Sequence, residues 1–426
     1  MLRHTVSLLL TCALIVCLLP PLAAEAQDVI RFGAVAAEYE FPQAIFFSVV
    51  VEGDAEIVAL EFSYRVTGSA YTQSRFPDFT PGKRVETTFR LDTQVEFHSP
   101  GTEFHYYWTA RDAAGRVIES PEQVLLYEDN RFVWQKVFTD RIAVYWYEGE
   151  ASFGQMVLDT ASRALDRLEQ DTGVEAKRLI RIYLYANNRD FRGALGPNSA
   201  EWIGGQALPA RAIIVANITP DNDWEVRRMI PHEVSHLVLY QATHNPYAYN
   251  PNWLEEGIAV HNQEVADADF PYLVEEAARD GRLIPLRALS ASFPSDTDLA
   301  ILSYAESVSV VEFILDRYGE EGLARLVAVF AEGETADAAV QRALGLSLDE
   351  LEAEWRATLP AAERTPVPGE TPETSASRST SDAEVVLRVV ASALACTFLL
   401  AIGVVVAAVI VIVRRQRRQE DDPTLS

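Results

Sequence analysis

The spacing of apolar residues changes near residue 129, and this change constrains the fold of the chain more than any other feature. Before it, apolar and polar residues partly alternate, as they do in strands, for example at 45–53, 56–66 and 103–112. After it, apolar residues recur three and four positions apart, first over residues 151–173, as they do in amphipathic helices. The sequence therefore predicts a β region, followed by a region that begins as mixed α/β and ends in helices.

Two domains are predicted on either side of this change. Residues 27–129 are rich in short apolar stretches separated by Gly, Pro, Asp and Ser, which is typical of a small antiparallel sandwich such as an immunoglobulin or fibronectin type III module. No cluster of catalytic residue types occurs there, so packing or presentation is its expected role. The second domain is predicted over residues 130–360.

The N-terminus is predicted to be a signal peptide over residues 1–26. Arg3 precedes an apolar run over 6–22, and Ala-Glu-Ala at 24–26 fits a small-x-small cleavage pattern. A retained N-terminal anchor is the alternative, but the apolar run is short and contains Pro20.

A second apolar segment is predicted to be a transmembrane helix over residues 389–413. This run is uncharged, and as a helix it is roughly 37 Å long, enough to span a bilayer. Basic residues open the tail at 414–426, which places the tail in the cytoplasm. The Pro, Thr and Ser-rich residues 361–388 are predicted to be a disordered stalk. The expected location is the cell membrane, with a single pass and an N-terminal ectodomain outside the cytoplasm.

Charge and cysteine content exclude some functions and some kinds of stabilisation. The formal net charge of −26 gives no basic patch for nucleic acid, so no nucleic-acid partner is expected. Cys12 and Cys17 fall in the predicted signal peptide and Cys396 in the predicted transmembrane helix. The rest of the chain has no cysteine for disulfides, so it depends on its hydrophobic cores or on a bound metal.

The stretch HEVSH at 232–236 is the strongest functional motif in the chain. Residues four apart share one face of a helix, so His232 and His236 can direct two imidazoles at one metal ion such as zinc. Glu233 is offset around the helix and can reach a water molecule at that ion as a general base. Pro231 predicts a helix start or a kink just before the motif.

A catalytic zinc requires a third protein ligand and one open position. The turn-rich residues 244–252 can reverse the chain, and a second helix is expected to begin near Pro251. That helix carries two adjacent carboxylates, Glu255 and Glu256, which point roughly 100° apart. Spacing alone does not choose between them.

The two segments together, HEVSH and the WLEEGIA at 253–259, resemble the gluzincin metallopeptidases, in particular the peptidase MA-like domains and, more distantly, aminopeptidase N. Bacterial surface proteins with a β-domain and a C-terminal anchor are similar. The resemblance implies zinc as the cofactor, with Glu256 as third ligand and Glu255 at the variable position. The 19 residues between His236 and Glu256 are one more than is typical of the aminopeptidases, which keeps Glu255 as an alternative.

The same resemblance implies a mechanism and a substrate. Glu233 takes a proton from the zinc-bound water and passes it to the leaving amine of a peptide or protein substrate. A Tyr or His from a later segment stabilises the oxyanion; Tyr304 is the candidate, with Tyr240 and Tyr247 as rivals. Residues 210–216 are either the edge strand that holds the substrate or a plain core strand.

The predicted fold class is multidomain: an N-terminal all-β immunoglobulin-like sandwich, an α+β zincin-like (gluzincin) domain ending in helices, and a single transmembrane helix. The predicted function is a membrane-anchored, extracytoplasmic zinc metallopeptidase. One alternative is a non-catalytic cell-surface binding protein with a peptidase-like domain, although structural zinc sites usually contain cysteine. Another is a metal-dependent hydrolase of a different bond, such as an amide in a cell-wall peptide.

Overall fold

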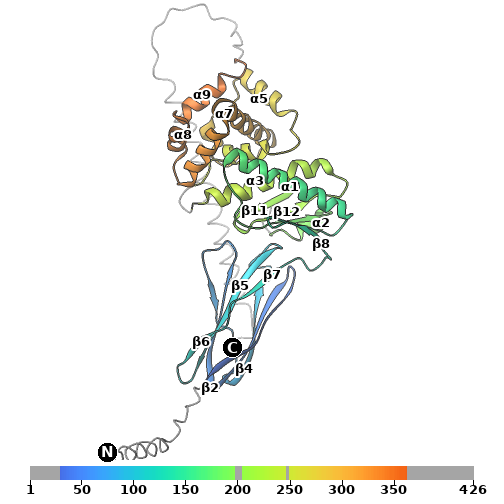
Figure 1. Ribbon diagram of the computed structural model, residues 1–426, viewed down its shortest axis with the longest axis vertical. Helices are drawn as coiled ribbons and strands as arrows, with labels where there is room; N and C mark the ends of the chain where they lie inside the picture. Colours follow the sequence, from blue (N-terminus) through green and yellow to red (C-terminus); the bar gives the residue numbers. More distant parts are fainter. Residues whose placement is uncertain (1–28, 197–203, 246–248, 362–426) are drawn as a thin grey trace, which may run out of the picture. The chain divides into compact units, whose positions relative to one another are not determined.

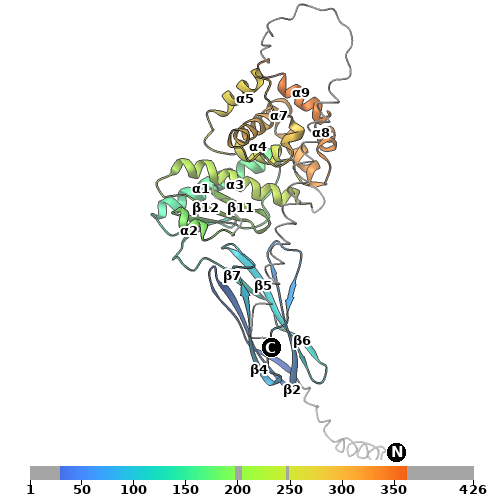
Figure 2. The same ribbon diagram turned by 180° about the vertical axis from the view of Figure 1, so that it is seen from behind.

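The computed structural model describes residues 29–196, 204–245 and 249–361 (Figure 1). A β-rich region comes first and a mainly helical domain follows, in the order that the change of periodicity predicts. Each region has its own sheet, and the second sheet carries most of the helices on one of its faces (Figures 1 and 2).

The first sheet has seven strands, and all of their pairings are antiparallel. Its strands are β1 (Ile30–Glu40), β2 (Ala44–Val66), β3 (Gln73–Arg75), β4 (Gly82–Asp92), β5 (Thr102–Asp112), β6 (Val117–Glu119) and β7 (Gln123–Tyr127). The central strand is β2, which pairs with four others: β1, β3, β4 and β5.

The predicted immunoglobulin-like sandwich of two separate sheets is corrected to one seven-stranded sheet, which bends over a single core so that the rings of Phe47 and Phe62, both on β2, lie 4.6 Å apart. The sequence pattern predicts two strands, 45–53 and 56–66, with a turn at Gly53. The chain instead runs through this point as one 23-residue strand. Near it, the register with β4 shifts between Glu52 and Ile57, and pairing with β5 begins at Ile57. The local turn signal at Gly53 therefore marks a bend within one continuous strand.

The C-terminal part of the predicted fold class and the predicted location are not borne out. Among the described residues, no helix is both long enough and apolar enough to cross a membrane. The predicted transmembrane helix at 389–413 lies outside the described residues. The predicted signal peptide at 1–26, the tail at 414–426 and all but the first residue of the stalk at 361–388 lie outside them as well.

The second sheet has five strands in the order β11-β12-β10-β9-β8. Its strands are β8 (Gln135–Phe138), β9 (Ile142–Trp146), β10 (Ile180–Tyr185), β11 (Gly205–Leu208) and β12 (Ile213–Asn217). The three inner strands are parallel to one another, and both edge strands run antiparallel to their neighbours. This arrangement makes β11 an edge strand, and it packs beside the helix at Asp223–Thr243.

The two faces of this sheet belong to two different cores. Ile182 and Ile214 point into a cluster with the long helices, whereas Tyr183 and Val215, the residues that follow them, point into the cluster of the first sheet. This alternation is the period of two that a buried strand imposes on its side chains. The long helices therefore cover one face, and residues of the first sheet pack against the other.

Nine α-helices occur in the described residues, with one short 3₁₀ turn at Pro209–Arg211. The α-helices are α1 (Ala151–Thr172), α2 (Asn188–Arg192), α3 (Asp223–Thr243), α4 (Asn252–His261), α5 (Phe270–Arg279), α6 (Leu286–Leu289), α7 (Thr297–Ala331), α8 (Ala336–Leu344) and α9 (Leu348–Arg356). Helices α1 and α3 pack beside each other against the sheet (Figures 1 and 2).

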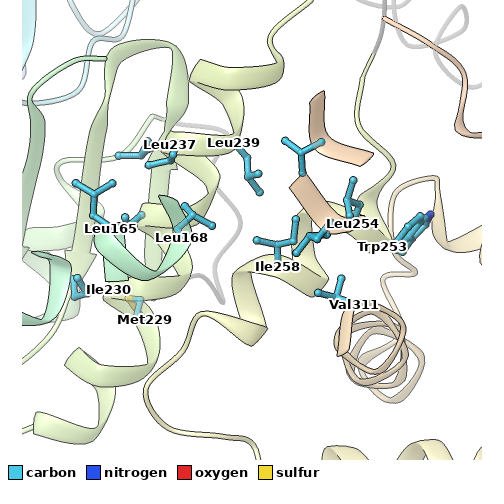
Figure 3. Packing of buried hydrophobic residues seen from close by; sticks show 14 of the residues in the cluster. Leu165, Leu168, Met229, Ile230, Leu237, Leu239, Trp253, Leu254, Ile258 and Val311 are labelled. Carbon is cyan, nitrogen blue, oxygen red and sulfur yellow. The ribbon is translucent and has the colours of Figure 1, made fainter. Parts of the chain in front are cut away.

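Helix α4 lies between α3 and α7 and packs tightly on α7. Ile258 of α4 and Val311 of α7 belong to the same buried cluster as Leu237 of α3 (Figure 3). A Cβ added at Gly257 would lie 2.4 Å from the carbonyl oxygen of Ser307, so only glycine permits this approach of the two helices. The position of α4 relative to α3 is therefore fixed by packing.

Candidate metal centre

Helix α3 carries HEVSH in its interior. The helix begins at Asp223, where the Asn222 side chain accepts a hydrogen bond from the Glu225 amide, so Pro231 lies inside the helix and, of the two predicted alternatives, is not its start. The imidazoles of His232 and His236 lie on one face, with their Nε2 atoms 3.3 Å apart. Both ring nitrogens are thus directed at one point beside the helix.

Helix α4 brings a carboxylate to the same point. Oε2 of Glu256 lies 3.4 Å from Nε2 of His232 and 3.6 Å from Nε2 of His236. One ligand atom from each of the three residues lies within 4.8 Å of the other two. Oε2 of Glu256 is buried and accepts no hydrogen bond from the described residues, so it is a free electron-pair donor in a protein interior.

The electrostatics of this cluster favour a cation. Burial alone would lower the pKa of His232, but the adjacent carboxylate of Glu256 and the charge of Glu233 raise it overall. Burial alone would raise the pKa of Glu256, but the two imidazoles lower it. The Glu256 carboxylate is thus favoured in its ionised form beside the two imidazoles, and this is the form that binds a metal ion.

The neighbouring Glu255 has a different environment. Its Oε1 accepts a hydrogen bond of 3.0 Å from the side-chain amide of Asn250, and burial raises its pKa. Of the two carboxylates that the sequence leaves open, the structure brings Glu256 to the histidines, and Glu255 is not among the three clustered ligands.

Glu233 and Tyr304 line a cleft of about 450 Å³ next to the cluster, together with His232. Gly204 and Gly205 also line this cleft, and Gly205 approaches α3 so closely that an added Cβ would lie 2.6 Å from Sδ of Met229. The cleft therefore gives a substrate access to both Glu233 and His232.

Tyr304 reaches the cleft from α7. Its ring centroid lies 6.4 Å from that of His232, and Phe293 packs against its face edge-on at 5.1 Å. Burial, together with the nearby charges of Glu256 and Glu233, raises the pKa of Tyr304 to about 12, so its hydroxyl stays protonated at neutral pH. Of the two rival tyrosines, Tyr240 stacks on His244 at 4.3 Å, and Tyr247 lies outside the described residues.

The edge strand beside the cleft is β11, not residues 210–216. The latter segment forms most of β12, which is buried and pairs with β10 on one side and β11 on the other. The sequence alone did not show this, because β11 has only four residues and its strand character depends on pairing with β12.

One residue near the cluster was not predicted. The side-chain amide of Gln263 lies 3.3 Å from Nδ1 of His232, the ring nitrogen that faces away from Glu256. Gln263 follows Glu256 by seven residues, about two helical turns, so in a continuous helix the two side chains would share one face. That spacing was the available signal, but α4 ends at His261, before Gln263 is reached.

Comparisons with known proteins give one family model and a number of distant solved structures, two of which are described below. Residues 160–361 match the family model of the Peptidase MA superfamily. This match confirms the resemblance to peptidase MA-like domains for these residues. A search of curated proteins finds no match in sequence.

Both structural likenesses are weak. One is to catalytically inactive OgpA from Akkermansia muciniphila in complex with an O-glycopeptide substrate, at 16% identity and a TM-score of 0.19, covering 24% of this chain and 30% of that one. The other is to aminopeptidase A from Legionella pneumophila in complex with aspartic acid, at 9% identity and a TM-score of 0.36, covering 73% of this chain and 47% of that one. This chain thus spans less than half of either protein.

Proposed function

We propose that this chain, whose residues 160–361 match the Peptidase MA superfamily, is a zinc-dependent metallopeptidase of the gluzincin type. The observation that carries the proposal is the convergence of His232, His236 and Glu256 beside a cleft that Glu233 also lines. The substrate class is a peptide or protein, because the reaction of this superfamily is hydrolysis of peptide bonds.

The three side chains fit zinc as its ligands. Two imidazole nitrogens and one carboxylate oxygen form a donor set typical of catalytic zinc, which keeps a fourth position open. The buried and unpartnered Oε2 of Glu256 is the strongest sign of fit, because such an atom otherwise costs folding free energy. His232, His236 and Glu256 would therefore hold the ion next to the cleft, which His232 also lines.

Each remaining residue of the cleft has a distinct chemical role. Bound zinc lowers the pKa of a water molecule toward neutrality and polarises the scissile carbonyl. Glu233 accepts a proton from that water and later delivers it to the leaving amine. The protonated hydroxyl of Tyr304 donates a hydrogen bond to the carbonyl oxygen as negative charge develops there.

Hydrolysis is favoured over a purely binding role by the position of Glu233. A structural metal site is closed by protein ligands, whereas this cluster adjoins a cleft with a carboxylate base and a tyrosine on its walls. A non-catalytic binding protein has no need for either group.

Removal of the metal tests the proposed function directly. The purified chain is expected to contain one equivalent of zinc and to cleave members of a peptide library. Dialysis against a chelator should abolish cleavage, and added zinc should restore it, because the open ligand position is where hydrolysis begins. A chain that binds no zinc, or that cleaves equally well after complete metal removal, would refute the proposal.

Tyr304→Phe is expected to lower kcat by about 10²–10³-fold, the usual effect of losing one oxyanion donor. Zinc content should stay at the wild-type level, since Tyr304 is not among the clustered ligands. Steady-state kinetics with a cleaved peptide measure the effect, and Tyr240→Phe is the matched control. Wild-type kcat in Tyr304→Phe would remove this residue from the mechanism.

A further inference from the structure

The imidazole of His232 has a polar neighbour at each of its two nitrogens. Nε2 faces Glu256 and His236, and Nδ1 lies 3.3 Å from the side-chain amide of Gln263. Gln263 is buried, with 9% of its surface exposed, and its amide oxygen has no hydrogen-bond partner among the described residues. A buried amide held against one ring nitrogen is an arrangement that can select a histidine tautomer.

The chemistry of metal binding decides which end of this amide faces the ring. A neutral imidazole that binds a metal through Nε2 carries its proton on Nδ1, so Nδ1 is a hydrogen-bond donor. Its partner must then be an acceptor, and the acceptor end of Gln263 is its oxygen. The oxygen and nitrogen of a glutamine amide have nearly the same shape, so a half-turn of the amide brings the oxygen to Nδ1 without moving the backbone.

We propose that Gln263 is a positioning residue that accepts the Nδ1 proton of His232 and thereby holds the ring with Nε2 directed at the metal. The inference depends on the zinc centre of the proposed function. Outer partners of this kind typically contribute about 10–100-fold to metal affinity, by fixing the tautomer and the orientation of the ligand.

The residues on either side of Gln263 fix its backbone to helix α3. The side-chain amide of Asn262 donates to the hydroxyl of Ser235 at 2.9 Å and lies 3.3 Å from the carbonyl oxygen of Pro231. These contacts fall one residue before and three residues after His232, so they hold the segment beside the ligand that Gln263 touches.

Pro231 leaves one backbone carbonyl of α3 free to bind the same segment. A residue at this position of a helix would donate its N–H to the carbonyl of Arg227, but proline has none. The Arg227 carbonyl instead accepts the backbone N–H of Glu264 at 2.9 Å. Residues 262–264 therefore contact α3 on both sides of His232 and at His232 itself. These contacts account for the position of the Gln263 side chain beside the imidazole of His232.

Zinc affinity of the full-length protein, measured by competition with a chromophoric chelator, tests the proposal. Gln263→Leu keeps the approximate size but removes the acceptor, and it is expected to weaken zinc binding by about 10–100-fold. Gln263→Glu keeps an acceptor and is expected to bind zinc within about threefold of wild type or more tightly, as carboxylates serve the same outer role. Gln155→Leu, an exposed position on α1, should leave the affinity unchanged.

The rescue by glutamate separates positioning from a general loss of structure. Gln263→Asn, which retains the amide but shortens the side chain by one methylene, replaces the leucine variant if that variant does not fold, and the same loss is expected. Wild-type affinity in the leucine or asparagine variant, or a glutamate variant as weak as leucine, would overturn the inference and leave the proposed function standing. A wild-type protein that binds no zinc would overturn both.

Discussion

Glu233→Gln is expected to lower kcat for peptide hydrolysis by about 10²–10⁴-fold, the range over which general bases contribute to catalysis. The amide has nearly the same shape as the carboxylate but cannot take a proton from water. Glu233 lines the cleft and is not one of the three clustered ligands, so the variant should retain its zinc. The measurement is kcat on a cleaved peptide, together with the zinc content of the same preparation.

A second substitution on the same helix serves as the control for Glu233→Gln. Glu225→Gln also exchanges a carboxylate for an amide in α3, but Glu225 pairs with Arg228 in the first turn of the helix. It is expected to leave kcat near the wild-type value. Full activity in Glu233→Gln with zinc present would mean that another group takes the proton, and the assigned role would be wrong.

Glu256→Gln is expected to weaken zinc binding by more than about 100-fold. Residues that only hydrogen-bond to a metal ligand already contribute about 10–100-fold to metal affinity, and a direct ligand contributes more. The carboxylate oxygen of Glu256 completes the three-atom cluster with the two histidines. A neutral amide is a poorer donor and leaves the positive ion without a compensating charge in a buried site. Chelator competition measures the zinc affinity, and loss of peptide cleavage should accompany the loss of zinc.

The adjacent residue offers a matched control for Glu256→Gln. Glu255→Gln makes the same chemical change one position earlier in the same helix, at a side chain that hydrogen-bonds to Asn250. Zinc affinity should stay close to that of wild type. The reverse pattern, with zinc lost in Glu255→Gln and kept in Glu256→Gln, would show that the ligand has been assigned to the wrong carboxylate.

Local geometry explains why the centre of the site could be predicted from sequence. The i, i+4 spacing of His232 and His236 fixes their relation as soon as the segment is helical, whatever the rest of the chain does. The relation of Glu256 to them depends on a turn and on the packing of α4 against α3 and α7. Spacing therefore left Glu255 and Glu256 open, and only the resemblance to a known family distinguished them before the structure did.

Features that depend on distant partners could not be predicted in this way. The strand character of β11 comes from its pairing with β12, and the contact of Gln263 with His232 joins residues from two elements. Pro231 indicates a helix start or a kink when considered locally, yet Glu264 satisfies the carbonyl that proline leaves free and the helix continues past Pro231. In each case a tertiary contact replaced what the local signal predicted.

The same reasoning explains the corrections to the fold. The alternation of apolar residues correctly indicated strands before residue 129, because alternation is a local property. Whether those strands form one sheet or two depends on which strands pair, and β2 pairs with β1 and β4 before its bend near Gly53 and with β5 after it. The number of sheets thus depends on which strands pair, and the alternation of apolar residues along the sequence carries no information on strand pairing.

A structure of the zinc-loaded protein, with the metal located by anomalous scattering, tests the central claim most directly. The account predicts one zinc ion about 2.0–2.1 Å from Nε2 of both His232 and His236, bound by a carboxylate oxygen of Glu256, with a fourth position open toward Glu233. An ion held elsewhere, or one closed off by four protein ligands, would contradict it.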